Sequence, residues 1–412
     1  MPAHTAGCSP EAPREAPGRP PWEVADVLRH YGESYCAAYR VPPSHHKVMH
    51  DILVCRTAAL GGHAEQCPQC GFERYAYNSC RNRHCPKCQT LTKAQWVADR
   101  QAELLPVPYF HCVFTLPHEL NALVLANKRP LLTLLLRAAS QTLLQFGRQN
   151  LGGQLGGIQV LHTWDQTLGA HFHVHCLVPG GALADNGTRW IPTHPRFLFP
   201  VHALSPVFRG KFLEALHSST TMGTLVFPGE TEPLATPEGF RRFIDQLYTK
   251  VWIVYAKQSM AGPGHVLDYL SRYTHRVAIA NHRIIDMQDG QVRFPYRNRR
   301  QGNRVQTMTL EAPEFIRRFL LHVVPQGLQR MRHIGFLANR CKARALRQCR
   351  QLLDQPPDPP ARPVKSVAEW LWQLTGKDIT RCPECGQGPL LRLPLPPLPP
   401  RHPSLPPIWD SS

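Results

Sequence analysis

Apolar residues recur along the chain at two periods, and each period predicts a different kind of element. A spacing of three or four residues, typical of a helix with one buried face, occurs over residues 22–40, 44–60, 120–127, 130–150, 208–217, 240–248, 265–275, 313–323 and 335–353. Apolar runs or apolar–polar alternation, typical of strands, occur over residues 109–116, 158–164, 171–178, 189–191, 251–255, 277–280, 283–286, 291–296 and 305–310. Helices and strands are therefore mixed along the chain, and we expect an α+β fold.

The two ends and one internal block lack the apolar residues of a packed core. Residues 1–21 are rich in proline, alanine and charge and are expected to be disordered. The cysteine-rich block 61–90 indicates a small domain stabilised by metal. Residues 389–407 are rich in proline and leucine and are expected to be extended or disordered. We therefore divide the chain into a disordered N-terminus (1–21), a helical lead-in with a zinc-binding domain (22–100), a large domain (101–353) and a proline-rich tail with one Cys-x-x-Cys pair (354–412).

Basic residues strongly outnumber acidic ones. The formal net charge of the 412-residue chain is +18 at pH 7. Such a charge favours a polyanionic partner such as nucleic acid, because contacts with phosphates release condensed counterions. Solubility alone, or an acidic substrate, is the alternative explanation.

Nothing in the sequence resembles a signal peptide or a membrane span. The first twenty residues contain no apolar stretch, and the most apolar run, residues 131–136, stops at Arg137. Several of the fourteen cysteines lie in Cys-x-x-Cys pairs, which fits metal-bound thiolates in a reducing compartment. We therefore expect a cytoplasmic protein with no membrane partner.

Two Cys-x-x-Cys pairs predict a zinc ribbon. Fourteen residues separate the pair Cys67–Cys70 from the pair Cys85–Cys88. Two such pairs close a tetrahedral thiolate site, whose zinc is structural because no coordination position stays open. Cys80 and His84 lie between the pairs. Either could replace one of the four ligands or help to bind a second zinc, and Cys80 could instead be a small buried residue.

A third pair, Cys382–Cys385, has no evident mate in the sequence. Cys341 and Cys349 lie upstream on a predicted helix, so a second four-ligand site built with them is a weaker hypothesis.

Histidines alternate on one predicted strand. In the segment 171–175 (HFHVH), all three imidazoles share one face and the apolar residues take the other. His173 and His175 are the expected ligands of a catalytic divalent ion. His162, on the preceding strand, would join them through antiparallel pairing. His171 lies at the entrance of its strand as an outer neighbour. Imidazoles suit manganese or zinc, whereas cellular abundance favours magnesium.

Two tyrosines form a candidate nucleophile. Tyr269 and Tyr273 are four residues apart, so on a helix they lie on one face. A pair of half-buried aromatic side chains is the alternative. Because a phenol with a pKa near 10 attacks poorly, it needs a group that favours phenolate. Arg272, His275 and Arg276, together with a metal opposite, are candidates for that group.

Four segments in order resemble the IS91 family of insertion-sequence transposases. They are residues 77–89 (YNSCRNRHCPKCQ), 171–181 (HFHVHCLVPGG), 269–282 (YLSRYTHRVAIANH) and 332–340 (RHIGFLANR). The similarity spans roughly residues 22–388. This family belongs to the HUH endonucleases, named for a histidine–hydrophobe–histidine motif.

The resemblance implies an HUH-type palm of antiparallel sheet with flanking helices, with residues 101–353 as the catalytic domain. It also implies a metal-dependent enzyme that nicks and rejoins single-stranded DNA at the ends of an insertion sequence. Tyr273, or Tyr269, would attack a phosphate, giving a 5′-phosphotyrosine and a free 3′-OH during rolling-circle transposition. The metal implied is magnesium or manganese beside the structural zinc, and Tyr273 is the preferred nucleophile.

Arginines near the tyrosines and on a basic hairpin are the expected DNA contacts. The hairpin 293–304 (RFPYRNRRQGNR) mixes aromatic and basic residues, which suits stacking on bases and contact with phosphates. The DNA-binding candidates are Arg272, Arg276, Arg297, Arg299, Arg300 and Arg304. A solvated, charged turn is the alternative reading of the hairpin.

Two other functions compete with this one. A non-catalytic zinc-ribbon DNA-binding protein, or an inactive transposase copy, would need neither the histidines nor the tyrosines. A histidine-cluster metalloenzyme for a small molecule is disfavoured by the net charge and by Cys176-Leu177, which follow the histidines where such sites often continue with Asp-His.

Overall fold

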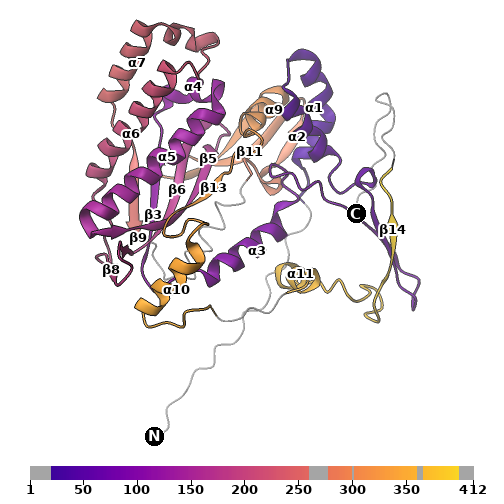
Figure 1. Ribbon diagram of the computed structural model, residues 1–412. Coiled ribbons are helices and arrows are strands. Elements are labelled where there is room, and N and C mark those ends of the chain that lie inside the picture. The colour runs from indigo at the N-terminus through magenta and orange to yellow at the C-terminus, as the bar shows by residue number, and fades with distance from the viewer. Residues whose placement is uncertain (1–19, 259–276, 299–300, 360–364, 399–412) are drawn as a thin grey trace.

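A five-stranded antiparallel sheet forms the centre of the molecule (Figure 1). The computed structural model describes residues 20–258, 277–298, 301–359 and 365–398. The strand order is β13 (Met331–Gly335), β5 (Gly156–Trp164), β6 (Ala170–Pro179), β3 (Tyr109–Thr115) and β9 (Val254–Gln258). Every neighbouring pair is antiparallel. The strand that carries His173 and His175 is therefore central, as expected for a palm of this type.

Leucine-rich helices cover one face of this sheet. Helices α4 (Asn121–Ala126), α5 (Lys128–Phe146), α6 (Val201–Thr221) and α7 (Pro237–Thr249) lie on the same side of the strands (Figure 1). Phe172, Val174 and Cys176 of β6 point into this core together with leucines of α5 and phenylalanines of α6. Because side chains alternate along a strand, the histidines between them point to the opposite face.

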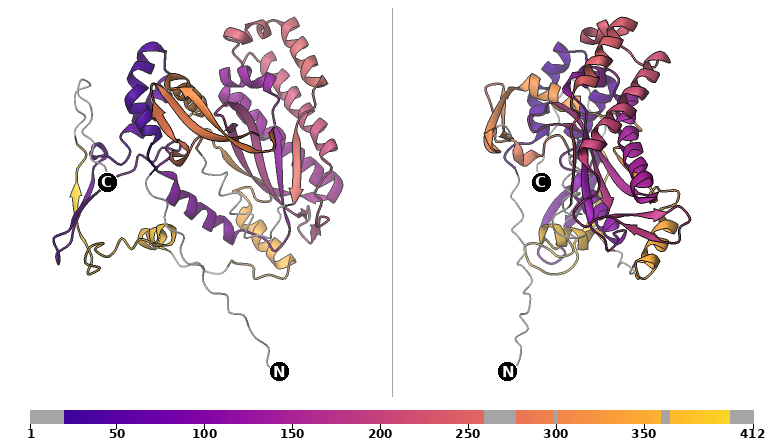
Figure 2. Two further views of the ribbon diagram at one scale, coloured as in Figure 1. Left: turned by 180° about the vertical axis from the view of Figure 1, so that it is seen from behind. Right: turned by 90° about the vertical axis from the view of Figure 1, so that its left-hand side faces the viewer.

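A second lobe joins the N-terminus to a distant part of the chain. It contains α1 (Val24–Ala38), α2 (Pro43–Leu53), a sheet of β10 (Asp286–Gln288), β11 (Gln291–Asn298) and β12 (Arg304–Glu311), and α9 (Ala312–Leu321). Val24 and Leu28 of α1 share one buried core with Phe294 and Phe315. Figure 2 shows α1 and α2 beside the β10–β12 sheet. The N-terminal helices are therefore packed on residues 286–321.

The remaining elements are short and lie around these two lobes. They are β1 (Gly62–Gln66), β2 (Glu73–Tyr77), α3 (Gln89–Ala102), β4 (Gly153–Gln154), β7 (Gly181–Ala184), β8 (Trp190–Pro192), α10 (Lys342–Leu352), α11 (Val367–Thr375) and β14 (Leu391–Leu395). Strand β14 pairs with β1, and β1 pairs with β2, in a separate three-stranded sheet. Helices α3 and α10 contribute to a third apolar cluster against the central sheet.

Most of the predicted elements are present, with informative differences. Residues 277–280 were predicted as a strand but form a short irregular segment, and β13 was not predicted. Residues 389–407 were expected to be extended or disordered; Leu391–Leu395 is extended, but it is a paired strand. The predicted helix 265–275 and residues 1–19 lie outside the described residues. In the part of the chain that is described, no helix is both long and apolar enough to cross a membrane.

Candidate metal centres

Three histidines converge on the face of the central sheet opposite α5 and α6. Strands β5 and β6 pair with His162 directly opposite His173. A ring nitrogen of each of His162, His173 and His175 lies within 4.8 Å of those of the other two. Nitrogens that hold one ion at about 2.1 Å are roughly 3–4 Å apart, so small ring rotations would suffice to bind one. His162 and His175 are buried, and His173 is half-buried at the more open side.

His111 on β3 was not predicted as a site residue, yet it contacts the cluster directly. Its Nε2 lies 2.8 Å from Nδ1 of His175, and the two rings stack with centroids 5.0 Å apart. Burial lowers the pKa of His111 to about 4, so this ring is neutral near pH 7. A hydrogen bond at one nitrogen of an imidazole fixes the ring so that the other nitrogen can bind metal.

The sequence signal for His111 was weak, because a lone histidine in an apolar strand is common. Only the pairing of β3 with β6 brings this residue beside His175.

Apolar and aromatic groups surround the cluster on the β5 side. The Trp164 ring stacks on His162 with centroids 4.8 Å apart. A tryptophan in this position excludes water from one side of the imidazole and limits its rotation. The Asp165 carboxylate, three residues after His162, accepts hydrogen bonds from Thr167 and from the Gly169 N–H. Its carboxylate therefore closes the turn between β5 and β6.

The basic hairpin is fastened to that same turn. Gln166 accepts a hydrogen bond from the Arg297 N–H at 2.7 Å through its side chain. The Arg283 guanidinium donates to the carbonyls of Gln166 and Pro295 at 2.9 and 2.6 Å. Arg297 is exposed near the end of β11, and Arg304 is exposed at the start of β12. The hairpin thus lies next to the turn between β5 and β6, a few residues after His162.

Several predicted site residues lie outside the described residues. These are Tyr269, Tyr273, Arg272, Arg276, Arg299 and Arg300. The two tyrosines, Arg272 and Arg276 follow strand β9, which ends at Gln258 and is an edge strand of the central sheet.

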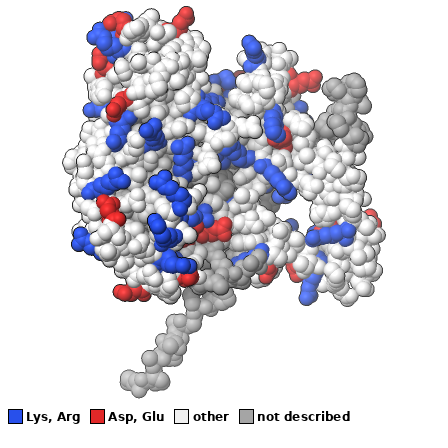
Figure 3. Space-filling view, viewed as in Figure 1, with Lys and Arg blue, Asp and Glu red and all other residues white. Residues whose placement is uncertain are grey.

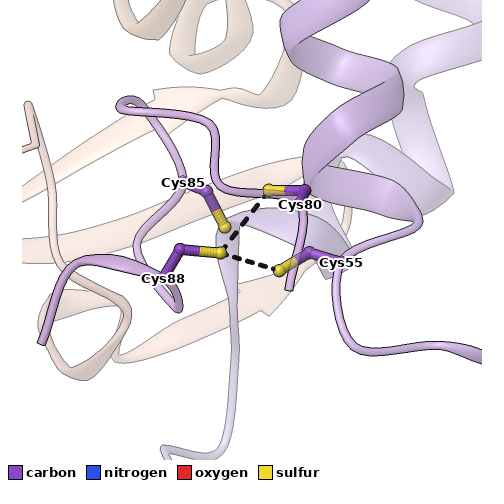
Figure 4. A group of neighbouring side chains, drawn as sticks. All are labelled: Cys55, Cys80, Cys85 and Cys88. Atoms are coloured by element: carbon purple, nitrogen blue, oxygen red, sulfur yellow. Dashed lines mark hydrogen bonds between the residues drawn. The ribbon is translucent and has the colours of Figure 1, made fainter. Parts of the chain in front are cut away.

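Four cysteines close to α2 form one thiolate cluster. Figure 4 shows the sulfurs of Cys55, Cys80, Cys85 and Cys88 pointing toward one another. The Sγ atoms of Cys55 and Cys80 lie 3.1 and 3.5 Å from that of Cys88. These distances exceed the roughly 2.05 Å of a disulfide and are somewhat shorter than the roughly 3.8 Å between thiolates around one zinc, so a small expansion would let the four sulfurs share one ion. This cluster fits a structural zinc, because all four coordination positions are filled by protein.

The predicted ribbon of Cys67, Cys70, Cys85 and Cys88 is corrected by this geometry. Cys85 and Cys88 belong with Cys55 and Cys80, whereas Cys67 and Cys70 meet Cys382 and Cys385. The β1–β2 hairpin extends Cys67 and Cys70 away from Cys85, toward the sheet edge where β14 is paired. Cys341 and Cys349 join neither cluster.

Two signals in the sequence pointed to this arrangement. The first signal is Cys80, a candidate ligand between the two pairs. A site made of Cys80, Cys85 and Cys88 needs a fourth ligand, and Cys55, just after α2, supplies it. The segments 67–71 and 382–386 are both Cys-Pro-x-Cys-Gly, whereas Cys88 is followed by Gln89. The repeated pattern therefore indicates that the pair Cys67–Cys70 belongs with the pair Cys382–Cys385.

The cluster of Cys55, Cys80, Cys85 and Cys88 is packed against the rest of the molecule. Cys55 and Cys85 are part of the buried core of the second lobe. Next to the cluster, the Arg83 guanidinium donates to the carbonyls of Leu328 and Pro325 at 2.7 and 2.9 Å, in the loop that leads into β13. Lys87 forms an ion pair with Glu23, which precedes α1. The cysteine cluster therefore connects the N-terminal helices to the central sheet.

Basic side chains predominate on the face drawn in Figure 3. Lys and Arg are spread over both the sheet-and-helix body and the smaller part beside it, with fewer acidic side chains. This surface is consistent with the net charge of +18 and with a polyanionic partner.

Comparison with known proteins gives matches along most of the chain. The family described as "Transposase zinc-binding domain" matches residues 27–116, and the family described as "Putative transposase" matches residues 156–345. The "Putative transposase y4qJ" of Sinorhizobium fredii (strain NBRC 101917 / NGR234) is 46% identical over 376 residues, which are 90% of this chain and 94% of that protein. The "Transposase for insertion sequence element IS801" of Pseudomonas savastanoi pv. phaseolicola is 27% identical over 338 residues, 81% of this chain and 80% of that protein. No solved structure matches the chain.

Proposed function

Because the chain belongs to the IS91 family of insertion-sequence transposases, we propose that it nicks and rejoins single-stranded DNA at the ends of its element. The observation that carries this proposal is the convergence of His162, His173 and His175 on one face of the central sheet. A non-catalytic DNA-binding protein would have no use for three imidazoles whose nitrogens meet within 4.8 Å.

The histidine cluster is the proposed seat of a catalytic magnesium or manganese ion. When bound there, such an ion would polarise the scissile phosphate as a Lewis acid. His162 and His173 would bind the ion from adjacent strands. His111 fixes the ring of His175 through the contact at Nδ1. A phosphate would approach beside His173, which is more exposed than His162 and His175. Imidazole donors favour manganese over magnesium in affinity.

Tyr273, or Tyr269, is the proposed nucleophile. Its phenolic oxygen would form a bond to the 5′ phosphorus while the bond from phosphorus to the 3′ oxygen breaks. The phenolic proton leaves to solvent, and the 3′ oxygen departs as a hydroxyl after taking up a proton. The phosphotyrosine keeps the energy of the phosphodiester, so a 3′-OH can reverse the step and rejoin strands without ATP.

The arginines named above are proposed to hold the DNA strand at this site. Arg297 and Arg304 are exposed on the β11–β12 hairpin, which is attached to Gln166 in the turn between β5 and β6, the two strands that carry the histidines. Arg272, Arg276, Arg299 and Arg300 are proposed to contact the same strand. Residues 22–100 would act as the zinc-binding part, 101–353 as the catalytic part, and 1–21 and 354–412 as the terminal segments. Such a protein would act on bacterial DNA in the cytoplasm, close to the nucleoid.

A covalent adduct tests the proposed reaction. Incubated with Mn²⁺ and single-stranded oligonucleotides that tile the ends of its element, the wild-type chain should form a protein–DNA adduct that mass spectrometry maps to Tyr273 or Tyr269. Replacing both with phenylalanine (Tyr269→Phe with Tyr273→Phe) should abolish the adduct and leave DNA affinity within about twofold, because only the reacting oxygens are lost.

The matched control is Tyr248→Phe, which alters an exposed tyrosine on α7 and should leave adduct formation unchanged. An adduct formed at the wild-type level by the double variant would disprove the tyrosine mechanism. Tight binding of DNA by the wild type without any adduct would favour the inactive-copy alternative.

His111 is predicted to be a positioning residue for the metal. His111→Phe keeps the ring volume but loses the 2.8 Å contact with His175, and should raise the Mn²⁺ concentration needed for half-maximal nicking by roughly 10- to 100-fold. His111→Gln retains a hydrogen-bonding group and should recover part of the loss. The control His333→Phe changes a histidine on edge strand β13 and should not move the Mn²⁺ midpoint. A His111→Phe variant that nicks more slowly at every Mn²⁺ concentration, with an unshifted midpoint, would mean that His111 is only structural.

A further inference from the structure

The two Cys-Pro-x-Cys-Gly segments at opposite ends of the chain adopt the same turn. In the first, the Gly71 N–H donates to the Cys67 carbonyl at 3.0 Å, and in the second the Gly386 N–H donates to the Cys382 carbonyl at 2.9 Å. The Cys67 and Cys382 N–H groups donate to residues five positions later, Phe72 and Gln387. Both glycines have positive φ, +74° and +68°, a conformation that other residues adopt at a cost. Each turn directs its two thiols to one side.

The four thiols of these turns meet one another. The Cys67 and Cys385 sulfurs are 3.7 Å apart, the Cys70 and Cys382 sulfurs are 3.6 Å apart, and all four lie within 4.8 Å of one another. Four thiolates at about 2.3 Å from one zinc are separated by roughly 3.8 Å along the edges of the tetrahedron. The observed distances match that edge and are far longer than the roughly 2.05 Å of a disulfide.

The surrounding structure brings the two turns together from distant parts of the sequence. Strand β14 pairs with β1 over five residues, from Gly62 opposite Leu395 to Gln66 opposite Leu391. A Cβ on Gly61 would lie 2.6 Å from the Leu395 carbonyl oxygen, so the close approach of the tail requires glycine there. Cys67 and Cys382 are each only 2% exposed and pack with Leu390 and Phe72.

A buried carboxylate fastens the same three strands by charge. Glu65 on β1 is 3% exposed and forms ion pairs with Arg74 of β2 and with Arg392 of β14, the latter at 3.0 Å. Burial raises the pKa of Glu65, but its hydrogen bond to Arg74 and the nearby positive charges outweigh this effect and lower it. The strand pairing and this ion-pair network position the C-terminal turn opposite the N-terminal one.

We propose that Cys67, Cys70, Cys382 and Cys385 bind a second structural zinc that fastens the C-terminal segment to the β1–β2 hairpin. Two of these ligands lie within the matched zinc-binding domain, residues 27–116, and two lie beyond residue 345, where the second family match ends. The site has four protein ligands, so the zinc it takes supports structure and not catalysis. The chain thus carries two separate thiolate zinc sites, and one of them joins the β1–β2 hairpin to residues 382–385.

Zinc stoichiometry tests the second site without reference to DNA cleavage. The purified full-length chain should contain two tightly held zinc ions, measured by elemental analysis against protein concentration. The double variant Cys382→Ser with Cys385→Ser should contain one. The matched control, Cys36→Ser with Cys341→Ser, changes two half-buried cysteines outside both clusters and should retain two. One zinc in the wild type, or two in the Cys382/Cys385 variant, would overturn the proposal.

Thiol labelling of the wild-type chain tests the site even where a serine variant does not fold. With increasing chelator, Cys67, Cys70, Cys382 and Cys385 should lose their protection from alkylation together, as one group resolved by mass spectrometry. Cys382 and Cys385 reactive from the start, with Cys67 and Cys70 released together with Cys85 and Cys88, would instead support a single ribbon. Since neither experiment measures nicking, the second zinc site and the proposed transposase chemistry can fail independently.

Discussion

Replacing His173 or His175 with alanine is expected to lower nicking of single-stranded DNA by at least about a hundredfold. Each change removes a ligand of the proposed catalytic ion, whose stabilisation of charge on the phosphate amounts to several kcal/mol, and each 1.36 kcal/mol corresponds to a tenfold change in rate. Affinity for the same oligonucleotide should stay within a few fold, because the exposed Arg297 and Arg304 lie on a different element. Nicking rates and equilibrium binding, measured on the same preparation, provide the two readouts.

A neighbouring histidine supplies the control for this prediction. His171 is on the same strand and the same face, but it does not belong to the group of three converging nitrogens. His171→Ala should therefore retain most of the nicking activity. His175 is buried, so His175→Gln, which fills most of the space, separates loss of metal from loss of packing. Wild-type nicking by His175→Gln and by His173→Ala would refute the assignment of the histidine cluster as the catalytic metal site.

Loss of the zinc held by Cys55, Cys80, Cys85 and Cys88 is expected to destabilise the protein strongly. Structural zinc contributes about 10 kcal/mol or more to the folding of isolated zinc fingers. Here Cys55 and Cys85 lie in the core that joins α1 and α2 to the β10–β12 sheet and α9. The variant Cys85→Ser with Cys88→Ser should therefore unfold at a temperature lower by roughly 10 °C or more, corresponding to several kcal/mol.

Limited proteolysis should locate this damage within the chain. Cleavage of the variant should begin in the segment that contains α1, α2 and α3, because these helices depend on the cysteine cluster and on Arg83 beside it. The control Cys36→Ser changes a half-buried cysteine on α1 outside the cluster and should unfold at the wild-type temperature. A zinc-free Cys85/Cys88 variant with unchanged thermal stability would show that this cluster does not stabilise the fold.

The elements that local periodicity defines could be predicted from the sequence. The run Tyr109–Thr115 and the alternating segment Ala170–Pro179 are strands because their apolar residues bury one or both faces of a sheet. The pairing of His162 with His173 also followed from local information, because a strand, a short turn and a return strand fit the spacing between them. Helix α3 and strand β13 were missed, since neither contains a strong apolar period.

What the sequence determined by itself was the chemistry and its local order: histidines alternating on one strand, cysteines in paired turns and a basic hairpin. Only the tertiary structure decided which of these groups meet. Cys70 and Cys382 are 312 residues apart, and His111 reaches His175 only because β3 pairs with β6. The physical reason is that a ligand set depends on distances of a few ångströms in space. The folding of the whole chain sets these distances, whereas local periodicity carries information only about neighbours in the sequence.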